Sequence, residues 1–181
     1  PDKRRRLAVD VGAHVGLWTR VLARSFPQVR AFEPVPAMAE CFARNVEHLE
    51  NVVLYPVAVS DREGQVVIER VEGNSGNSRV ALQVDVTDQT LGASFTAVEA
   101  VRLDDVVDLR EQTVDFIKVD VEGWELNVLR GAEIIIRQDH PILVVEQKPN
   151  NAERYGLRRT DAVDLLKSWG AIVLWEKAGD F

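Results

Sequence analysis

Short apolar runs alternate along the chain with segments whose apolar residues recur at helical spacing, and this alternation restricts the possible folds most strongly. The apolar runs predict β-strands at residues 7–11, 29–33, 52–59, 115–120, 142–146 and 171–175. The helical spacing predicts helices at residues 15–26, 37–49, 124–129, 134–138 and 160–169. When strands and helices alternate, consecutive strands pair in parallel through right-handed crossovers. We therefore predict a doubly wound, Rossmann-like α/β sheet that is mostly parallel.

The middle of the chain departs from this alternation. Two further strands are predicted at residues 65–71 and 97–103, and the segments between them are polar and contain glycines. This pattern is typical of antiparallel strands joined by loops, so we predict a β-hairpin and loop excursion around residues 64–103. We expect residues 72–94 to be mobile and to close over a substrate. The absence of an internal repeat or a linker in the sequence favours a single domain over residues 1–181.

Composition excludes several classes of protein. The 181 residues are 46% hydrophobic and 28% charged, which is typical of a globular chain. No apolar run approaches the roughly 20 residues that a membrane helix needs, so we expect no membrane association. The net charge of −7 argues against a nucleic-acid partner. A single cysteine, Cys41, excludes an internal disulfide and a cysteine-based zinc cluster, and we expect a cytoplasmic protein.

A turn with two glycines follows the first predicted strand, in the sequence DVGAHVG at residues 10–16. In open α/β sheets, ligands bind at the carboxyl ends of strands, near the point where strand order reverses. Gly12 allows a tight turn and a close approach of a ligand, and Gly16 allows the next helix to pack near the strand. The spacing differs from the GxGxxG dinucleotide fingerprint. A strand-to-helix turn without a ligand would also explain it.

An acidic residue, Glu33, ends the second predicted strand about 20 residues after the glycine turn. A carboxylate at this place can accept hydrogen bonds from both hydroxyls of a ribose. The alternative is a solvated turn residue in front of Pro34. The combination with the glycine turn favours a nucleoside-binding site.

The chain resembles the FkbM family of S-adenosylmethionine-dependent methyltransferases. The matching segments occur in order: VDVGAHVG at 9–16, FEP at 32–34, PVAVSDREG at 56–64, DFIKVDVEGWELNVLRGA at 115–132 and ILVVE at 142–146. The KVDVEGWE stretch is the most specific of them. The resemblance implies a class I methyltransferase fold with a seven-stranded sheet whose final strand is antiparallel. It also implies S-adenosylmethionine as cofactor and O-methylation of a small molecule or sugar.

The resemblance assigns cofactor-binding positions residue by residue. It implies that Asp10, Gly12 and Gly16 surround the methionine half of the cofactor and that Glu33 binds the ribose hydroxyls. The full set of implied cofactor-binding residues is Asp10, Gly12, Ala13, His14, Gly16, Glu33, Pro34, Ser60, Asp61 and Asp120.

Ser60, Asp61 and His14 have more specific expected roles. The resemblance implies that Ser60 and Asp61 lie beside the adenine. His14 stands where relatives often have asparagine, and its ring can still donate a hydrogen bond. His14 is therefore either a contact of the loop and cofactor or a catalytic base.

Candidate catalytic residues lie at the ends of the strands at 115–120 and 142–146. Strand alternation places Lys118 and Asp120 on one face. A lysine among apolar residues needs a carboxylate partner, for which Asp120 and Glu146 are candidates. Lys118 could then act as a base, or it could form a structural ion pair between two strands.

Glu122 follows Asp120 by two residues and precedes Gly123 at the strand-to-helix turn. The catalytic candidates are Asp120, Lys118, Glu122 and Glu146. Asp120 and Glu122 could supply hard oxygen ligands to a divalent ion, but no ligand cluster in the sequence completes a site, and we expect no metal. Trp124 could form a wall for the substrate or pack against the sheet.

The expected reaction is methyl transfer from S-adenosylmethionine to a hydroxyl of a small molecule or sugar. One alternative is a nicotinamide-dependent oxidoreductase, although GxGxxG and a Tyr–Lys hydride site are missing from the sequence. The other is a cofactor-binding but inactive partner subunit. The Asp/Asn-Pro-Pro-aromatic motif of amino-group methylation is absent, because Asp120 is followed by VEG.

Overall fold

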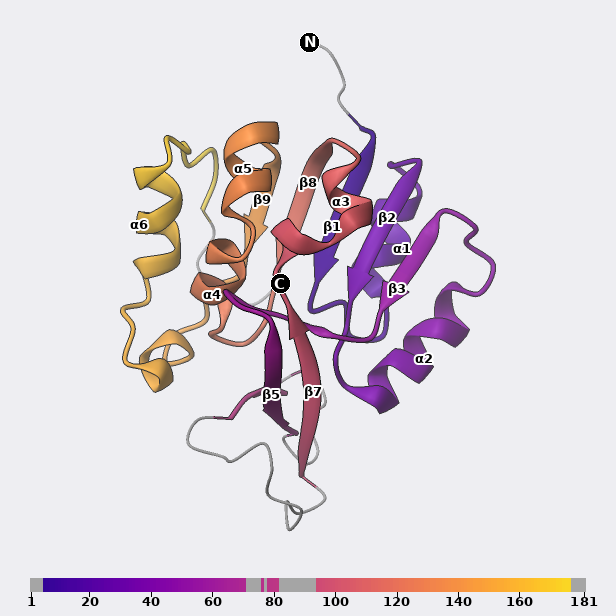
Figure 1. The fold of residues 1–181 in the computed structure, drawn as a ribbon, viewed down its shortest axis with the longest axis horizontal. Helices are drawn as coiled ribbons and strands as arrows, with labels where there is room; N and C mark the ends of the chain where they lie inside the picture. The colour runs from indigo at the N-terminus through magenta and orange to yellow at the C-terminus, as the bar shows by residue number, and fades with distance from the viewer. Residues whose placement is uncertain (1–4, 71–75, 77, 82–93, 177–181) are drawn as a thin grey trace.

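The computed structural model describes residues 5–70, 76, 78–81 and 94–176. Its centre is a five-stranded parallel sheet with the order β3-β2-β1-β8-β9 (Figure 1). The strands are β1 Leu7–Val11, β2 Gln28–Phe32, β3 Val52–Tyr55, β8 Val114–Val119 and β9 Ile142–Val145. All five residues of β1 are buried. Strands covered on both faces consist of continuous apolar residues, and this explains why the sequence identified them.

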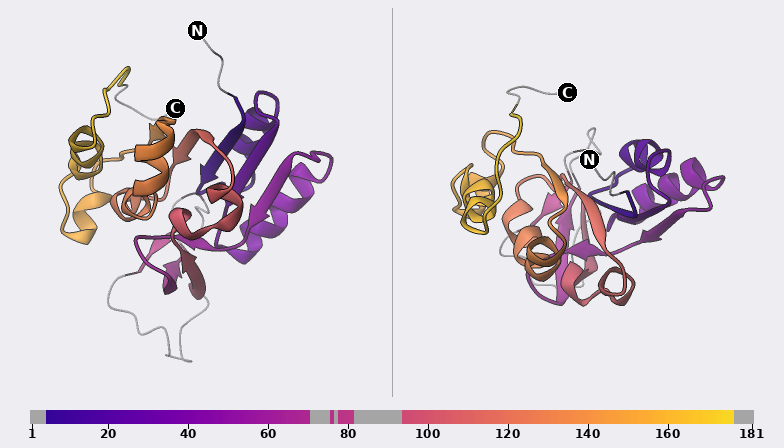
Figure 2. Two further views of the ribbon diagram at one scale, coloured as in Figure 1. Left: turned by 45° about the horizontal axis from the view of Figure 1, so that its top comes forward. Right: turned by 90° about the horizontal axis from the view of Figure 1, so that it is seen from above.

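Helices cover both faces of this sheet (Figure 2). On one face, Leu22 of α1 packs with Ala8 and Phe116, whereas on the other face Val9 packs with residues such as Val128. The first face carries α1 Leu17–Ala23 and α2 Pro36–Val46, and the second carries α3 Val107–Arg110, α4 Glu125–Arg130, α5 Glu133–Asp139 and α6 Asp161–Ser168. The predicted doubly wound α/β class is confirmed.

The strand order reverses at β1, which lies between β2 and β8. Val11 is in register with Phe32 on one side and with Val119 on the other, so these three strands end side by side. Val119 is likewise in register with Val145 of β9. The turns that follow these strands therefore meet at one edge of the sheet, the edge at which open α/β proteins bind ligands.

A second sheet lies beyond this edge, with the order β4-β7-β5-β6 (Figure 1). Its strands are β4 Ala58–Val59, β5 Gly64–Glu69, β6 Arg79–Val80 and β7 Phe95–Val101. The antiparallel pairing of β5 with β7 confirms the excursion predicted around residues 64–103. The strand β6 was not predicted. Most of the expected lid at residues 72–94 lies outside the described residues.

The prediction of a last strand at residues 171–175 is wrong. None of these residues is in a strand, and within the described residues β9 pairs only with β8. The antiparallel final strand and the seven-stranded sheet are therefore not found in the described part of the chain. Ile172 and Leu174 are each 79% exposed. An apolar run becomes a strand only where a neighbouring strand pairs with its backbone, and the backbone hydrogen bond of this segment from Ala171 N to the Leu166 carbonyl belongs to the end of α6.

The described residues also include the 3-10 segments η2 Leu103–Asp105 and η3 Ala152–Tyr155. Among the described residues, none of the helices has both the length and the apolar character required to cross a membrane.

Candidate functional site

The glycine turn between β1 and α1 packs against the end of β8. Gly12 has a φ of 75°, and a Cβ atom built there would lie 1.8 Å from the carbonyl oxygen of Asp120. The backbone N–H groups of Gly12 and Ala13 both donate to the Phe32 carbonyl, each at 3.0 Å. Glycine is therefore required at position 12 because two backbones come into contact, in addition to any role in binding a ligand.

Glu33 lies at the carboxyl end of β2 beside this turn. Its side chain accepts hydrogen bonds from the backbone N–H of His14 at 2.8 Å and of Val35 at 2.9 Å. The residue is only 5% exposed, so the alternative of a solvated turn residue is wrong. Burial raises the pKa of Glu33, and the two backbone hydrogen bonds partly offset this effect. Each carboxylate oxygen keeps a lone pair that could accept a hydroxyl proton.

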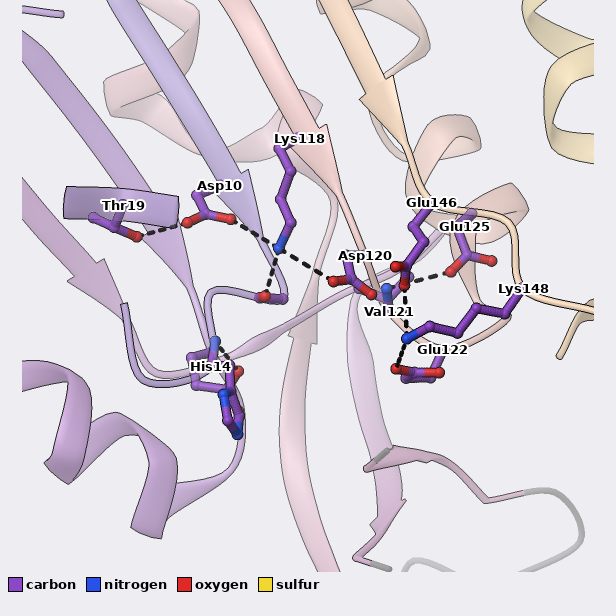
Figure 3. A network of polar contacts seen from close by, with 12 residues as sticks. Asp10, His14, Thr19, Lys118, Asp120, Val121, Glu122, Glu125, Glu146 and Lys148 are labelled. Carbon is purple, nitrogen blue, oxygen red and sulfur yellow. Dashed lines mark hydrogen bonds and ion pairs between the residues drawn. The ribbon is translucent and has the colours of Figure 1, made fainter. Parts of the chain in front are cut away.

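The Lys118 side chain lies between the ends of β1 and β8 and reaches toward the glycine turn (Figure 3). Its Nζ donates to the Gly12 carbonyl at 2.8 Å and lies 3.2 Å from Asp10 Oδ1 and 3.7 Å from Asp120 Oδ2. The other oxygen of Asp10 accepts a hydrogen bond from Thr19 Oγ1 at 2.6 Å. Lys118 and Asp10 are almost fully buried. This arrangement favours the structural ion pair over a catalytic lysine.

The expected partners of Lys118 are only partly correct. Asp120 is one of them, but the nearer carboxylate is that of Asp10, which the sequence analysis assigned to the cofactor alone. Within the described residues Glu146 forms no ion pair with Lys118 and instead pairs with Lys148. The reason is register, because Lys118 is paired with Asp10 across β1 and β8, whereas Glu146 lies one residue beyond β9.

Asp120 and Glu146 come together at the ends of β8 and β9. Backbone hydrogen bonds extend the sheet to both residues, from Asp120 N to the Val11 carbonyl and from Glu146 N to the Val119 carbonyl. Desolvation and a side-chain hydrogen bond with Asp120 raise the pKa of Glu146 to about 7. Two carboxyl groups in contact share a proton, and such a pair can take up a proton near neutral pH.

Glu122 lies on the turn after β8 and is buried. Its Oε1 accepts a hydrogen bond from Lys148 Nζ at 2.8 Å, and its Oε2 accepts one from Asn151 Nδ2 at 2.7 Å. Lys148 Nζ also lies 2.9 Å from Glu146 Oε2. Glu122 therefore lies on the turn after β8, beside the Asp120–Glu146 pair, and both of its oxygens accept hydrogen bonds from protein side chains.

Three carboxylates converge at this end of the sheet. Oxygen atoms of Asp120, Glu122 and Glu146 all lie within 4.8 Å of one another. A divalent cation could be held at this spacing. The Lys148 ammonium already contacts two of the three carboxylates, so the cluster is charge-compensated by the protein's own residues and we assign no metal to it.

Two of the remaining predicted contacts lie close to the glycine turn. His14 has a φ of 51°, and burial lowers its pKa while the Asp120 carboxylate opposes this effect. Pro34 directly follows Glu33 and is half-buried. Their positions suit a contact with a ligand held by Glu33.

Ser60 and Asp61 follow β4 and lie near Trp124. Ser60 is buried, donates a hydrogen bond to Asp61 Oδ1 and accepts one from Trp124 Nε1. Trp124 also meets Tyr155 edge to face, with ring centroids 5.0 Å apart. These contacts indicate that Trp124 packs against the protein, and they leave Asp61 as the more accessible of the two residues assigned to adenine.

Sequence reasoning missed three residues that shape the site. Lys148 and Asn151 hold Glu122, and Glu125 accepts hydrogen bonds from the backbone N–H groups of Val121 and Gly123. Glu125 could have been found from the sequence as an acidic residue in the first turn of the helix predicted at residues 124–129. Lys148 and Asn151 lie in a loop without periodicity, so only the tertiary structure reveals them.

The strand order, the glycine turn at the switch point and the buried acid at the end of β2 define an open, doubly wound α/β protein with a candidate ligand site at the carboxyl edge of its sheet. The methyltransferase FkbM domain matches residues 10–175. The chain therefore belongs to the FkbM methyltransferase family.

Two curated relatives share 30% identity with this chain. Methyltransferase sdnD of Sordaria araneosa aligns over 156 residues, which is 69% of this chain and 60% of that protein. Methyltransferase 1 of Beauveria bassiana aligns over 146 residues, which is 69% of this chain and 57% of that protein. The chain thus spans less than two thirds of the length of these relatives.

A solved structure has the same fold. The crystal structure of methyltransferase FkbM from Methylobacillus flagellatus KT superposes with a TM-score of 0.59 and 20% identity. The match covers 91% of this chain and 36% of that chain.

Proposed function

We propose that this chain is an S-adenosylmethionine-dependent methyltransferase that methylates a hydroxyl of a small molecule or sugar. The observation that supports it most strongly is the Glu33 carboxylate, which is buried and fixed by the His14 and Val35 backbone beside the glycine turn. An acid held at this position suits the two hydroxyls of a ribose. Family membership favours methyl transfer over hydride transfer and leaves the oxidoreductase alternative without support.

The residues present fit the cofactor. Glu33 would accept the ribose hydroxyls, the turn from Gly12 to Gly16 would face the methionine half, and Asp61 would lie beside the adenine. The positively charged sulfonium of the cofactor supplies an electrophilic methyl group. The Asp120 carboxyl group, at the end of β8, lies 3.7 Å from Lys118 Nζ, which also contacts that turn (Figure 3).

The Asp120–Glu146 pair would accept the proton of the acceptor. An alcohol is a poor nucleophile at neutral pH, so a base beside it assists the reaction. With the cofactor bound, transfer of its methyl group to the acceptor oxygen would yield the methyl ether and S-adenosylhomocysteine, and the Glu146 carboxylate would take up the hydroxyl proton.

Calorimetry with S-adenosylmethionine, S-adenosylhomocysteine and NAD tests this function. We expect both sulfur compounds to bind and NAD not to bind. Tight NAD binding without a response to S-adenosylhomocysteine would refute the proposal. Binding of S-adenosylhomocysteine without release of that product, across a set of hydroxylated sugars and metabolites, would favour the inactive partner subunit.

A further inference from the structure

The loop that follows β9 contributes a lysine to the carboxylate cluster. Lys148 Nζ lies 2.8 Å from Glu122 Oε1 and 2.9 Å from Glu146 Oε2 (Figure 3). Its side chain is 34% exposed. Among the described residues, no other cation forms an ion pair with Glu122 or Glu146. Lys148 is therefore the link between these two carboxylates.

One end of this link is fixed. Glu122 is buried, and its second oxygen accepts the hydrogen bond from Asn151. The turn that carries Glu122 is closed by Glu125, whose Oε1 accepts a hydrogen bond from Gly123 N at 2.9 Å. A carboxylate bonded through both oxygens cannot rotate without breaking a buried hydrogen bond. Glu122 therefore anchors the Lys148 ammonium.

The other end is a half-buried group. The Glu146 side chain is 28% exposed, and its contacts are Lys148 and Asp120. We propose that Lys148 is a positioning residue, which holds the Glu146 carboxylate against Asp120 at the place where the acceptor hydroxyl loses its proton. This inference rests on the proposed function, in which the Asp120–Glu146 pair takes up that proton.

Charge balance around the pair supports this role. Oxygens of Asp120, Glu122 and Glu146 lie within 4.8 Å of one another, so removing the ammonium would leave their repulsion uncompensated and would favour a protonated Glu146. The other charged or titratable groups that surround the pair are Lys118 from β8, Glu125 from the start of α4 and His14 from the turn after β1.

Lys148 itself stays charged. Burial alone would lower its pKa, but its hydrogen bonds to Glu122 and Glu146 act in the opposite direction, and the net effect is a pKa above the ordinary lysine value. The positive charge is therefore present throughout the range in which Glu146 titrates.

The test follows the Glu146 carboxyl by carbon-13 NMR of labelled glutamate side chains, with Glu146→Gln used to assign the signal. The wild-type midpoint is expected at about pH 7. Lys148→Met should raise this midpoint by about one unit, because it removes the nearest cation. Lys148→Arg keeps the positive charge, so its Glu146 midpoint should lie close to that of the wild type. Lys167→Met, at an exposed lysine of α6, should leave the midpoint unchanged.

A second variant shifts the midpoint in the opposite direction. Glu122→Gln removes the anchoring negative charge and should lower the Glu146 midpoint, which keeps the proposal testable if Lys148→Met does not fold. A role that is only structural would change the thermal stability of these variants without moving the midpoint. An unchanged midpoint in the folded variants would overturn the proposal.

Cofactor binding separates this proposal from the proposed function. Calorimetry should give Lys148→Met an S-adenosylhomocysteine affinity within about threefold of the wild type, since Lys148 contacts only the acceptor-side acids. A tenfold loss would make Lys148 part of the cofactor site and overturn the positioning role. If the wild type binds no S-adenosylhomocysteine, the proposed function fails, and the positioning role fails with it whatever the titration shows.

Discussion

At the scale of single residues, Glu33 serves both the fold and the proposed ligand. Its two oxygens accept the backbone N–H groups of His14 and Val35, so it ties the glycine turn to the start of α2. The same bonds fix the carboxylate where a ribose would lie. A group that is already oriented loses little conformational entropy when a ligand binds.

Glu33→Gln should weaken S-adenosylhomocysteine binding by tenfold or more. The change removes a charged acceptor, and hydrogen bonds to charged groups contribute about 1.5–3 kcal/mol. It also places an NH2 group against one of the two backbone donors, so a modest loss of stability is expected. Calorimetry on the folded variant measures the affinity. Glu40→Gln, at an exposed glutamate of α2, is the matched control, and equal affinity in both variants would contradict the assignment.

At the scale of elements, the turn between β8 and α4 and the loop after β9 form a closed pair. Gly123 has a φ of 104°, and a Cβ atom there would lie 2.5 Å from the Asn151 carbonyl oxygen and 2.9 Å from the Tyr155 ring. This close approach brings Asn151 and Lys148 to Glu122. The glycine therefore allows the loop to organise the acidic side of the site.

Gly123→Ala should destabilise the fold by about 2–4 kcal/mol, because the new methyl group meets fixed backbone and the backbone conformation is strained. Gly156→Ala is the matched control. Its φ is 70°, but a Cβ atom there meets nothing within 4 Å, so only the strain of about 1 kcal/mol should appear. Urea denaturation measures both. Equal losses in the two variants would show that the contact with Asn151 is unimportant.

At the scale of the whole molecule, the site lies where the parallel sheet and the second sheet come together. The Tyr155 hydroxyl donates to the Val80 carbonyl at 2.9 Å and so connects the loop after β9 to the second sheet. Burial raises the pKa of Tyr155 to about 12, which keeps this donor protonated. The loop that carries Lys148 and Asn151 is therefore attached to both sheets.

Stability should depend on pH through Glu146, whose pKa rises from 4.5 to about 7 on folding. The folded state holds this proton more tightly than the unfolded chain, so the stabilisation is complete below about pH 4.5 and is lost as the pH rises through about 7. Between about pH 5 and pH 8, the wild type should lose more free energy of unfolding than Glu146→Gln. Urea denaturation at both pH values checks this. Glu50→Gln, at an exposed turn, should lose as much free energy of unfolding as the wild type over this pH range. An equal loss in Glu146→Gln and the wild type would contradict the expectation.

Much of the fold follows from local sequence. The strands that became β1, β8 and β9 were predicted within one residue at most ends, since continuous apolar runs bounded by glycine, proline and acidic residues carry their signal locally. The acidic residues that follow β8 and β9, Asp120 and Glu146, were likewise identified from the sequence. Residues 171–175 have an equally apolar run but form no strand, because a strand depends on a partner that its own residues do not specify.

The sequence by itself thus determined the α/β class and the set of carboxylates near one edge of a sheet. Only the tertiary structure decided how these groups are paired. Lys118 meets Asp10 because of the register between β1 and β8, and Glu146 meets Lys148 because the loop after β9 folds back over Glu122. The contacts of Lys118 with Asp10 and of Lys148 with Glu122 join residues far apart in the chain, and their energies depend on burial and distance, which composition and periodicity do not encode.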